Sequence, residues 1–335
     1  MSDSAPTVSV CIPTYNRGSM LRDSIHSVLT QTFPDFELII SDNASEDDTE
    51  SIVRSFSDER IRYSRNSSNI GVRHNWNRCL ALARGKYIAI FPDDDIMLPE
   101  NLARKVAVLA GHPHVGLVHS HYQVMDPCGR ILTLNATKIP NGHRKPDGPQ
   151  PGREVLVTLL GRNIIHESTV LFRRACFEAC GGFTDRLSLA FDWEYWMRIA
   201  ERYDIACIPT PLVKWRDHSA SVTRQQSRRS DDTARSALRI DLDGLRWILK
   251  KYLPSVSHHR LEARMLVWRQ MGERVAGFAE VMLGDGGPSA DVRTFVVDMV
   301  RNYPEILVEK TVLKVILKSI LSRRSILTLK RMCRL

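Results

Sequence analysis

"TVSVCIPTYNRGSMLRDSIHSVLTQTFPDFELIISD", residues 7–42, is the stretch from which the fold is predicted. Residues 7–15 and 36–42 are apolar runs that end in polar residues, which is typical of buried strands. Between them, apolar residues recur at the three- and four-residue spacing of an amphipathic helix: Met20, Leu21, Ile25, Val28 and Leu29. A strand, a helix and a strand in this order predict a parallel β-α-β unit with a right-handed crossover.

The same alternation continues downstream. Helical patterns are found at residues 48–56, 72–85, 102–109, 177–183 and 192–203, and strand patterns at 61–66, 87–91, 115–126, 168–174 and 205–218. Residues 135–154 are rich in Pro, Gly and charge, so we expect a loop there. The pattern predicts an α/β fold with a doubly wound, mostly parallel sheet. In such sheets, ligands bind at the C-terminal ends of the strands.

The 335 residues are too many for one minimal domain. After about Val222, long helical segments dominate and strand patterns become rare. We expect the boundary between Ser219 and Ser230. Residues 1–222 then form the α/β domain, and residues 223–335 form a helical C-terminal extension.

The composition favours a soluble cytoplasmic protein. Hydrophobic residues make up 43% and charged residues 25% of the chain, as in ordinary globular proteins. No run of about 18 apolar residues and no basic-then-apolar start is found, so neither a transmembrane helix nor a secretory signal is expected. The seven cysteines are irregularly spaced, and the single close pair, Cys176 and Cys180, is weak evidence for zinc. Reduced, buried thiols in the cytoplasm are the better interpretation.

The net charge of +9 is concentrated at the C-terminus. Residues 301–335 contain nine Lys or Arg and two Asp or Glu, so they carry +7 and the remaining chain only +2. A folded nucleic-acid-binding face is therefore not expected. Lys310, Lys314 and Lys318 lie four residues apart among apolar residues, the pattern of a basic amphipathic helix. Two interpretations stay open: peripheral contact with the cytoplasmic face of a membrane, or packing on the protein with the lysines in water.

Three consecutive aspartates, Asp93, Asp94 and Asp95, follow the strand at residues 87–91. One aspartate would be enough to cap the helix that follows, and three adjacent carboxylates repel one another. A hard divalent cation, Mg²⁺ or Mn²⁺, would remove this repulsion, because it takes one or two carboxylates and leaves positions for water and phosphate oxygens. The triplet therefore predicts a metal site, with a solvated acidic turn as the alternative.

Asp42 ends the second predicted strand, where an acid commonly binds a nucleoside in doubly wound folds. The alternative is a turn or a helix cap. Neither G-x-G-x-x-G after the first strand nor G-x-x-x-x-G-K-[ST] is present, so a glycine-rich phosphate loop is not expected.

Four segments resemble the family-2 glycosyltransferases, which have the GT-A fold: "VSVCIPTYNR", "SVLTQTFPDFELIISDNASEDDT", "NIGVRHNWNRCLALARGKYIAIFPDDD" and "FDWEYWMRIA". The resemblance covers roughly residues 7–221. It implies metal-dependent, inverting transfer of a sugar from a nucleoside diphosphate sugar, of the UDP or dTDP type, to an acceptor hydroxyl. The acceptor would be a saccharide or a lipid-linked saccharide, as in the assembly of bacterial surface polysaccharide or glycolipid.

The resemblance also assigns roles to residues. The donor would be bound by a set drawn from the strand ends and the helix after residue 71: Pro13, Thr14, Tyr15, Arg17, Asp42, Asn69, Arg73, Asp93 and Asp94. Mn²⁺ or Mg²⁺ would be held by Asp93, Asp95 and His218, with Asp93 or Asp94 reaching the ribose. Arg65 is a further candidate for the phosphates. For both Arg65 and Arg73 the alternative is a solvated surface position.

The remaining assignments concern the acceptor. The resemblance makes Asp192 the catalytic base, and Phe191 stands where the family often has Glu, so Glu194 is the main competitor. His166, Glu167 and Trp193 are candidates for acceptor contact, with structural roles in the core as the alternative for His166 and Trp193. Two other functions remain open: a sugar nucleotidyltransferase, although "PTYNRGSM" is a poor glycine-rich loop, and a non-catalytic, membrane-associated binding module.

Overall fold

The computed structural model describes residues 5–136, 148–188, 190–219, 221, 231–284 and 289–308. The chain divides into two compact units. Unit 1 comprises Met1–Leu159, Asn163–Asp185 and Phe191–His218, and unit 2 comprises Leu160–Arg162, Arg186–Ala190 and Ser219–Leu335. The basic C-terminal segment from residue 309 onward, with its predicted amphipathic helix, lies outside the described residues.

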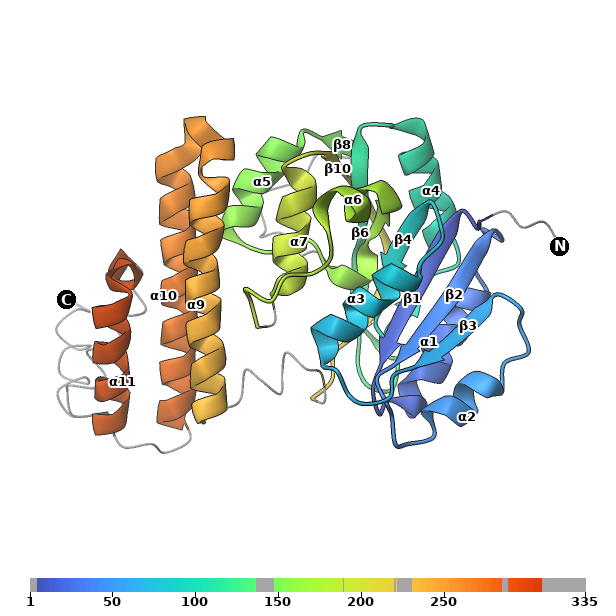
Figure 1. Cartoon of the computed structure of the whole chain (residues 1–335), viewed down its shortest axis with the longest axis horizontal. Coiled ribbons are helices and arrows are strands. Elements are labelled where there is room, and N and C mark those ends of the chain that lie inside the picture. Colours follow the sequence, from blue (N-terminus) through green and yellow to red (C-terminus); the bar gives the residue numbers. More distant parts are fainter. Residues whose placement is uncertain are drawn as a thin grey trace. The chain divides into compact units, whose positions relative to one another are not determined.

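Unit 1 is built on a ten-stranded mixed sheet (Figure 1). Its strands are β1 Val8–Thr14, β2 Phe36–Asp42, β3 Ile61–Arg65, β4 Tyr87–Ile90, β5 Ile96–Met97, β6 Val115–Met125, β7 Ile131–Ala136, β8 Gly148–Gln150, β9 Leu171–Arg173 and β10 Asp204–Arg216. The spatial order is β3-β2-β1-β4-β9-β6-β10-β5, with β7 beside β6 and β8 beside β10. The first four strands of this order are parallel, as are β6 and β10.

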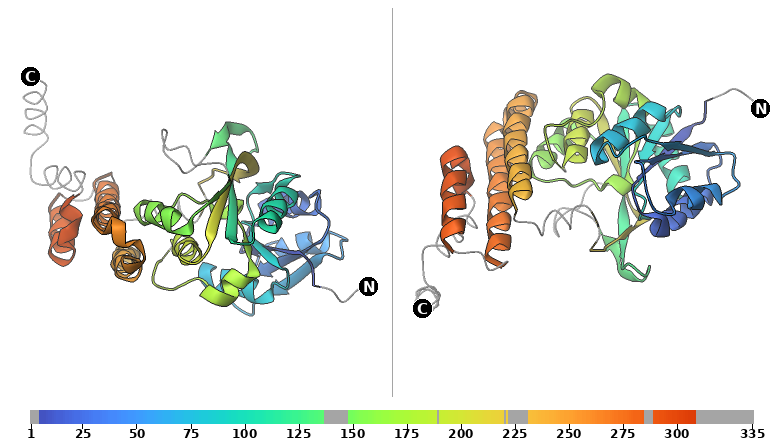
Figure 2. Two further views of the ribbon diagram at one scale, coloured as in Figure 1. Left: turned by 90° about the horizontal axis from the view of Figure 1, so that it is seen from above. Right: turned by 60° about the horizontal axis from the view of Figure 1, so that its bottom comes forward.

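Helices cover both faces of the sheet. They are α1 Gly18–Leu29, α2 Thr49–Arg54, α3 Val72–Leu82, α4 Asn101–Gly111, α5 Gly152–Gly161, α6 Arg174–Cys180 and α7 Phe191–Ala200, with a 3₁₀ turn, η1, at Glu167–Thr169. Figure 2 shows α4 and α7 on opposite faces of β6 and β10. Every residue of β1 and β2 is buried, which explains why these strands are continuous apolar runs and do not alternate.

The predicted α/β fold with a helical extension is confirmed, and two local expectations need correction. The segment predicted as a strand at residues 168–174 is half 3₁₀ turn, because the Thr169 hydroxyl and amide both donate to the His166 carbonyl. Its second half, β9, runs antiparallel to both β4 and β6. The segment predicted as a loop at residues 135–154 contains β8 and the start of α5, while residues 137–147 lie outside the described chain.

The described part of unit 2 contains these helices: α9 Asp232–Tyr252, η2 Pro254–His259, α10 Arg260–Gly284, α11 Ser289–Asn302 and η3 Pro304–Val308. Asp231 caps α9, since its side chain accepts a bond from the Ala234 amide at 2.9 Å. The buried face of α9 follows helical spacing, with Leu238, Leu242, Leu245 and Ile248 all at most 8% exposed. Among the described residues, no helix is long and apolar enough to cross a membrane.

Lys105 is an unusual buried charge in unit 1. It lies on the inner face of α4, 1% exposed, and has no hydrogen-bond or ion-pair partner among the described residues. Burial lowers the pKa of its ammonium to about 7, because a low-dielectric environment disfavours the charged form. The unfolded chain therefore binds one more proton than the folded chain between about pH 7 and pH 10.5, and stability rises with pH over that range.

We predict that Lys105→Met raises the free energy of unfolding by about 2–4 kcal/mol at pH 7. Methionine is nearly the same size as lysine, so the substitution removes the buried charge without leaving a large cavity. The gain over the parent should shrink as the pH rises toward 9. Urea denaturation at pH 6, 7, 8 and 9 measures both, with Arg104→Met on the same helix as the control. A gain that is absent, or that does not change with pH, would contradict the interpretation.

Candidate active site

The ends of β1, β2 and β4 meet at one edge of the sheet. Thr14 is paired with Asp42, and Cys11 is paired with Ile90, which is five residues before Asp95. The loops that follow these strands therefore begin side by side. This edge is the place at which doubly wound sheets bind ligands.

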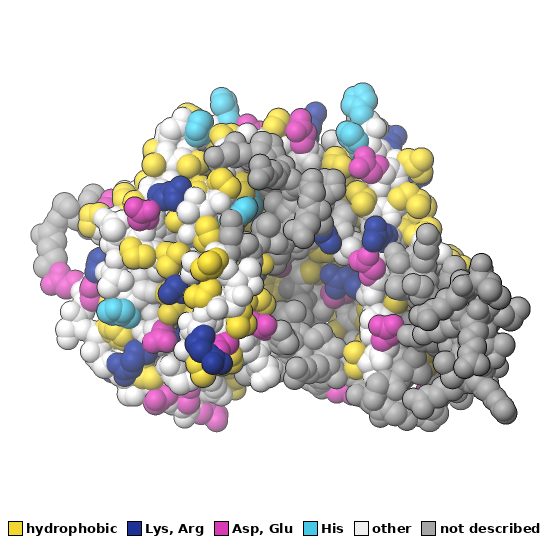
Figure 3. Space-filling view, turned by 180° about the vertical axis from the view of Figure 1, so that it is seen from behind, with side chains coloured by type: hydrophobic (Ala, Val, Ile, Leu, Met, Phe, Trp, Pro, Cys, Tyr) yellow, Lys and Arg dark blue, Asp and Glu magenta, His cyan; other side chains and the backbone are white. Residues whose placement is uncertain are grey.

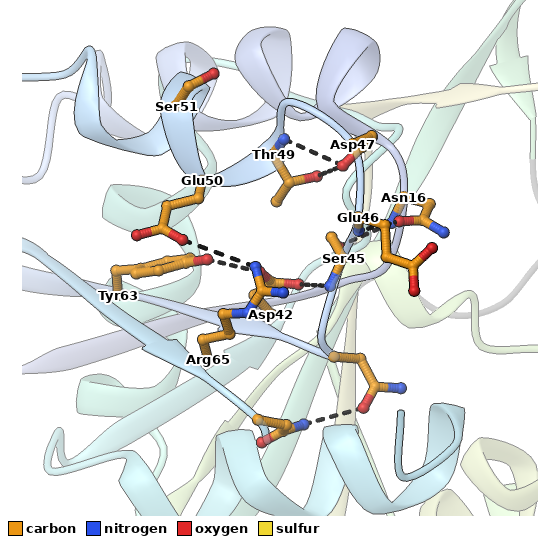
Figure 4. A network of polar contacts seen from close by, with 12 residues as sticks. Asn16, Asp42, Ser45, Glu46, Asp47, Thr49, Glu50, Ser51, Tyr63 and Arg65 are labelled. Carbon is orange, nitrogen blue, oxygen red and sulfur yellow. Dashed lines mark hydrogen bonds and ion pairs between the residues drawn. The ribbon is translucent and has the colours of Figure 1, made fainter. Parts of the chain in front are cut away.

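Asp42 is the centre of a buried polar network (Figure 4). It is fully buried at the end of β2. Its Oδ1 accepts a bond from the Ser45 amide at 2.8 Å, and its Oδ2 accepts one from the Tyr63 hydroxyl at 2.6 Å and lies 3.6 Å from Arg65 Nη1. Burial, followed by the adjacent Asp42, raises the pKa of Tyr63, so Tyr63 remains a donor. These contacts fix the orientation of the carboxylate.

The loops after β1 and β2 are tied together and strained. The Asn16 amide donates to Ser45 Oγ at 2.9 Å, and the Glu46 amide donates to Asn16 Oδ1 at 2.8 Å. Asn16 has φ 52° and Ala44 has φ 65°, in the left-handed region that costs a residue such as alanine about 1 kcal/mol or more. Such strain is held in place only where surrounding bonds over-determine it, and it clusters at functional sites.

An asparagine ladder continues from this loop toward α3. Asn43 donates to Asn69 Oδ1 at 2.7 Å, and Asn66 donates to Asn43 at 3.0 Å and to Asn75 at 3.1 Å. Asn69 Oδ1 also accepts the Gly71 amide at 2.9 Å. The ladder places the first turn of α3, which carries Arg73, beside the end of β2. The sequence patterns did not reveal this network, because lone asparagines carry no spacing signal.

The acidic triplet lies between β4 and β5, and each carboxylate has different partners. Arg17 Nη1 hydrogen-bonds Asp94 and lies 3.6 Å from Asp93 Oδ1. His218 Nε2 is 3.0 Å from Asp94 Oδ2. Asp95, by contrast, accepts bonds from the Ser168 hydroxyl and, at 2.8 Å, from the Arg216 amide.

Burial and these partners shift the pKa values of the three aspartates in different directions. Burial, and then the adjacent Asp94, raises the pKa of Asp93 to about 7. The same two causes raise the pKa of Asp95 well above its ordinary value. For Asp94, burial is outweighed by the hydrogen bond to His218 and the charge of Arg17, which hold its pKa below the ordinary value. Asp94 is therefore the triplet's most acidic member.

The donor set fits a hard divalent cation only in part. Asp94 and His218 offer an oxygen and a nitrogen close together, whereas Asp95 is 1% exposed and bonded to protein donors. In the part of the chain that the structure describes, no three His, Cys, Asp or Glu side chains are grouped so that they could hold an ion by themselves. Mg²⁺ and Mn²⁺ are commonly bound through one or two side chains, with phosphate oxygens and water completing the shell.

The two acids at the start of α7 have different surroundings. Asp192 is partly exposed, and its Oδ2 accepts a bond from Asn163 Nδ2 at 3.1 Å. Glu194 is fully buried and pairs with Arg198 Nε at 2.8 Å. Arg198 also donates to the carbonyls of Cys180 and Gly182, each at 2.7 Å. Glu194 is therefore a structural anchor, and Asp192 is the accessible carboxylate.

The candidates for acceptor contact are not equivalent. Trp193 is 2% exposed and donates from Nε1 to the Leu159 carbonyl at 2.7 Å, so its ring lies in the core and does not form a platform for a sugar. His166 is 6% exposed, with Nδ1 at 3.1 Å from Ser168 Oγ and at 3.4 Å from Glu167 Oε2. Its ring packs against two aromatic rings, those of Tyr122 and Trp215, at centroid distances of 4.8 and 5.5 Å.

The other predicted donor-binding residues surround the same edge. Tyr15, directly after β1, is 42% exposed, while Pro13 and Thr14 are buried within the strand end. Arg73 is half-buried and has no ion-pair partner among the described residues. Ser168 and Arg216, which bond Asp95, were missed because neither belongs to a motif recognisable in a single sequence.

The chain belongs to glycosyl transferase family 2. The family model described as "Glycosyl transferase family 2" matches residues 9–177. The putative glycosyltransferase EpsE of Bacillus subtilis (strain 168) is 30% identical over 242 residues, which cover 69% of this chain and 81% of that protein. The uncharacterized protein MT1568 of Mycobacterium tuberculosis is 29% identical over 229 residues, 65% of this chain and 69% of that protein. The protein is thus a glycosyltransferase.

Solved structures share the fold. TarS residues 1–349 of S. aureus, in complex with UDP-GlcNAc, superposes with a TM-score of 0.59 at 16% identity, covering 91% of this chain and 90% of that one. The mannosyltransferase PcManGT of Pyrobaculum calidifontis, in complex with GDP-Man and Mn²⁺, gives 0.57 at 18% identity, covering 96% and 89%. At these identities the likeness shows the fold alone.

We predict that Glu194→Gln lowers the free energy of unfolding by about 3 kcal/mol, because it leaves the largely buried guanidinium of Arg198, 14% exposed, without its counter-charge. Asp192→Asn should change stability by less than about 0.5 kcal/mol, since its side chain is partly exposed and its bond from Asn163 comes from a neutral amide. Urea denaturation of both variants measures the difference. Equal losses of stability would mean that the two acids do not have these separate roles.

Proposed function

We propose that the protein is a metal-dependent, inverting glycosyltransferase that moves a sugar from a nucleoside diphosphate sugar, of the UDP or dTDP type, to an acceptor hydroxyl. The observation that carries the proposal is that three groups of residues meet at one sheet edge. They are the polar network around Asp42, the Arg17–Asp94–His218 cluster, and Asp95 with its bonds from Ser168 and the Arg216 amide. The family membership and the nucleotide-sugar complexes of TarS and PcManGT support it.

The nucleoside would lie at the ends of β1 and β2. Tyr15 offers an exposed ring for the base beside Pro13 and Thr14, and the fixed Asp42 network offers hydrogen-bonding groups at the floor of the site. Asn69 is held beside Asn43 at the same edge. The diphosphate would then meet Arg17 and Arg73, whose guanidinium groups suit phosphate oxygens.

The cation would be held by Asp94 and His218, with Asp93 beside them. This assignment moves the predicted metal role of Asp95 to Asp94, because the Asp95 carboxylate is already bonded to Ser168 and to the Arg216 amide. Asp95 would then hold the triplet's backbone in position. Bound Mn²⁺ or Mg²⁺ supplies positive charge where negative charge grows on the leaving diphosphate.

Asp192 would act as the general base. Its carboxylate takes the proton of the acceptor hydroxyl while that oxygen bonds the anomeric carbon and the bond from this carbon to the diphosphate oxygen breaks. One displacement inverts the anomeric configuration and needs no nucleophilic side chain. Asn163 orients the carboxylate through its 3.1 Å bond. His166 and Glu167 would contact the acceptor, a saccharide or lipid-linked saccharide of bacterial surface polysaccharide or glycolipid assembly.

We predict release of nucleoside diphosphate when the protein is incubated with Mn²⁺ or Mg²⁺, a panel of nucleoside diphosphate sugars and candidate acceptors. Asp192→Asn should keep donor binding and lose at least about 100-fold in turnover, the usual contribution of a general base. Asp185→Asn, an exposed acid shortly before α7, is the control. Turnover of Asp192→Asn within about tenfold of the parent would reject Asp192 as the base.

The same panel tests the alternatives. Formation of pyrophosphate from a sugar phosphate and a nucleoside triphosphate would support a sugar nucleotidyltransferase. Binding of donors without turnover, across saccharide and lipid-linked acceptors, would support a non-catalytic binding module. Either outcome would overturn the proposed reaction.

We predict that Asp94→Asn and His218→Ala each weaken Mn²⁺ binding about tenfold or more in the presence of UDP, as loss of a direct ligand should do. Asp95→Asn should weaken it much less, because Asp95 acts through the backbone. Electron paramagnetic resonance of free Mn²⁺ measures the dissociation constants without turnover. If Asp95→Asn loses Mn²⁺ while Asp94→Asn keeps it, the cation role belongs to Asp95.

A further inference from the structure

Unit 2 contains a pocket of about 480 Å³ that is separate from the residues of the candidate active site. It is formed by the end of α9, by η2, by the first turns of α10 and by η3. All of these elements lie within unit 2, so the pocket belongs to one compact unit. Its volume falls in the range of pockets that take small ligands.

The pocket is strongly basic. Four of its lining residues are cationic, and one, Glu305, is acidic. Glu305 is already engaged by Arg246, through a short bond to Nε and a second bond of 2.9 Å to Nη2. The other three cations, Lys250, Arg260 and Arg264, are exposed and have no acidic partner among the described residues. The pocket lining therefore contains three positive charges that have no acidic partner among the described residues.

The rest of the lining is apolar. Leu249, Leu253 and Pro254 come from the end of α9 and the start of η2, and Trp268 comes from α10. Leu261 and Met265, beside Arg260 and Arg264 on α10, are 73% and 45% exposed. Figure 3 shows hydrophobic, His, acidic and Lys or Arg side chains side by side at the end of unit 2 where the two long helices are joined.

We propose that this pocket binds the phosphate headgroup of a lipid. A phosphate monoester carries nearly two negative charges and offers several acceptor oxygens, which match the guanidinium and ammonium groups of the lining. The apolar lining and the exposed Leu261 and Met265 would contact the first carbons of the acyl chains, as interfacial surfaces do. Free phosphate would use only the charged half of the pocket.

The proposal is tested with full-length protein in the absence of any sugar donor, so the result is independent of the transferase reaction. Calorimetric titration with monomeric dihexanoyl phosphatidic acid should show saturable binding at one site per chain. Dihexanoyl phosphatidylcholine and inorganic phosphate should each bind at least about tenfold more weakly, because the first lacks the net charge and the second lacks the apolar chains.

Arg264→Glu should weaken phosphatidic acid binding about tenfold or more, through loss of a charge-assisted hydrogen bond. Arg301→Glu, on the exposed face of α11, changes the net charge equally and should leave binding within about twofold. Lys250→Glu provides a second pocket variant if Arg264→Glu does not fold, and thermal unfolding checks each variant. Trp268 fluorescence should change on binding in the parent and in Arg301→Glu.

Three outcomes would overturn the proposal. Equal weakening by Arg264→Glu and Arg301→Glu would mean that only long-range charge attracts the lipid. Equally tight binding of inorganic phosphate would define a free-anion site and not a lipid site. Equally tight binding of phosphatidylcholine would mean that the pocket's charge does not select its ligand.

Discussion

The structure of unit 1 depends on the neutralisation of three adjacent carboxylates at the end of β4. No one segment does this. Arg17 comes from the loop after β1, Ser168 from η1, and the Arg216 amide and His218 from the end of β10. Each contact stabilises a charge or a buried polar atom that would otherwise be costly. Arg17 and His218, which lie near opposite ends of unit 1 in the sequence, are therefore held at one point.

The contacts also separate the roles of chemically identical neighbours. Asp95 is bonded to protein donors on both oxygens, while Asp94 faces a histidine and an arginine. The same principle separates Asp192, which is partly exposed, from Glu194, which is fully buried and paired with Arg198. In both cases burial and partners, and not residue type, decide which carboxylate is available to a ligand.

The sequence was sufficient to predict the alternation of strands and helices. Buried parallel strands appear as apolar runs, and amphipathic helices appear as apolar residues at three- and four-residue spacing. It was also sufficient for the accumulation of Asp42 and the triplet at one sheet edge. It could not reveal the direction of β9, since three residues carry no periodicity, or the tether between Ser168 and Asp95, which joins residues 73 positions apart. The burial of Trp193 also depends on tertiary packing. Trp193 lies in the first turn of α7, and the sequence does not show whether that turn faces the core or the solvent.

The placement of β9 has a consequence for the order in which the parts of unit 1 fold during synthesis. This strand of three residues fills the gap between β4 and β6, so the sheet stays in two halves until residue 173 has left the ribosome. The acidic triplet, synthesised some 80 residues earlier, meets Ser168 only then, and meets Arg216 and His218 later still. Because such long-range closure is slow, Arg17 is the one cation of this cluster that the nascent chain can place beside the acidic turn through much of its synthesis. This edge of the sheet is thus among the last parts of unit 1 to mature, and no amino-terminal fragment that stops before β10 can contain all of its contacts.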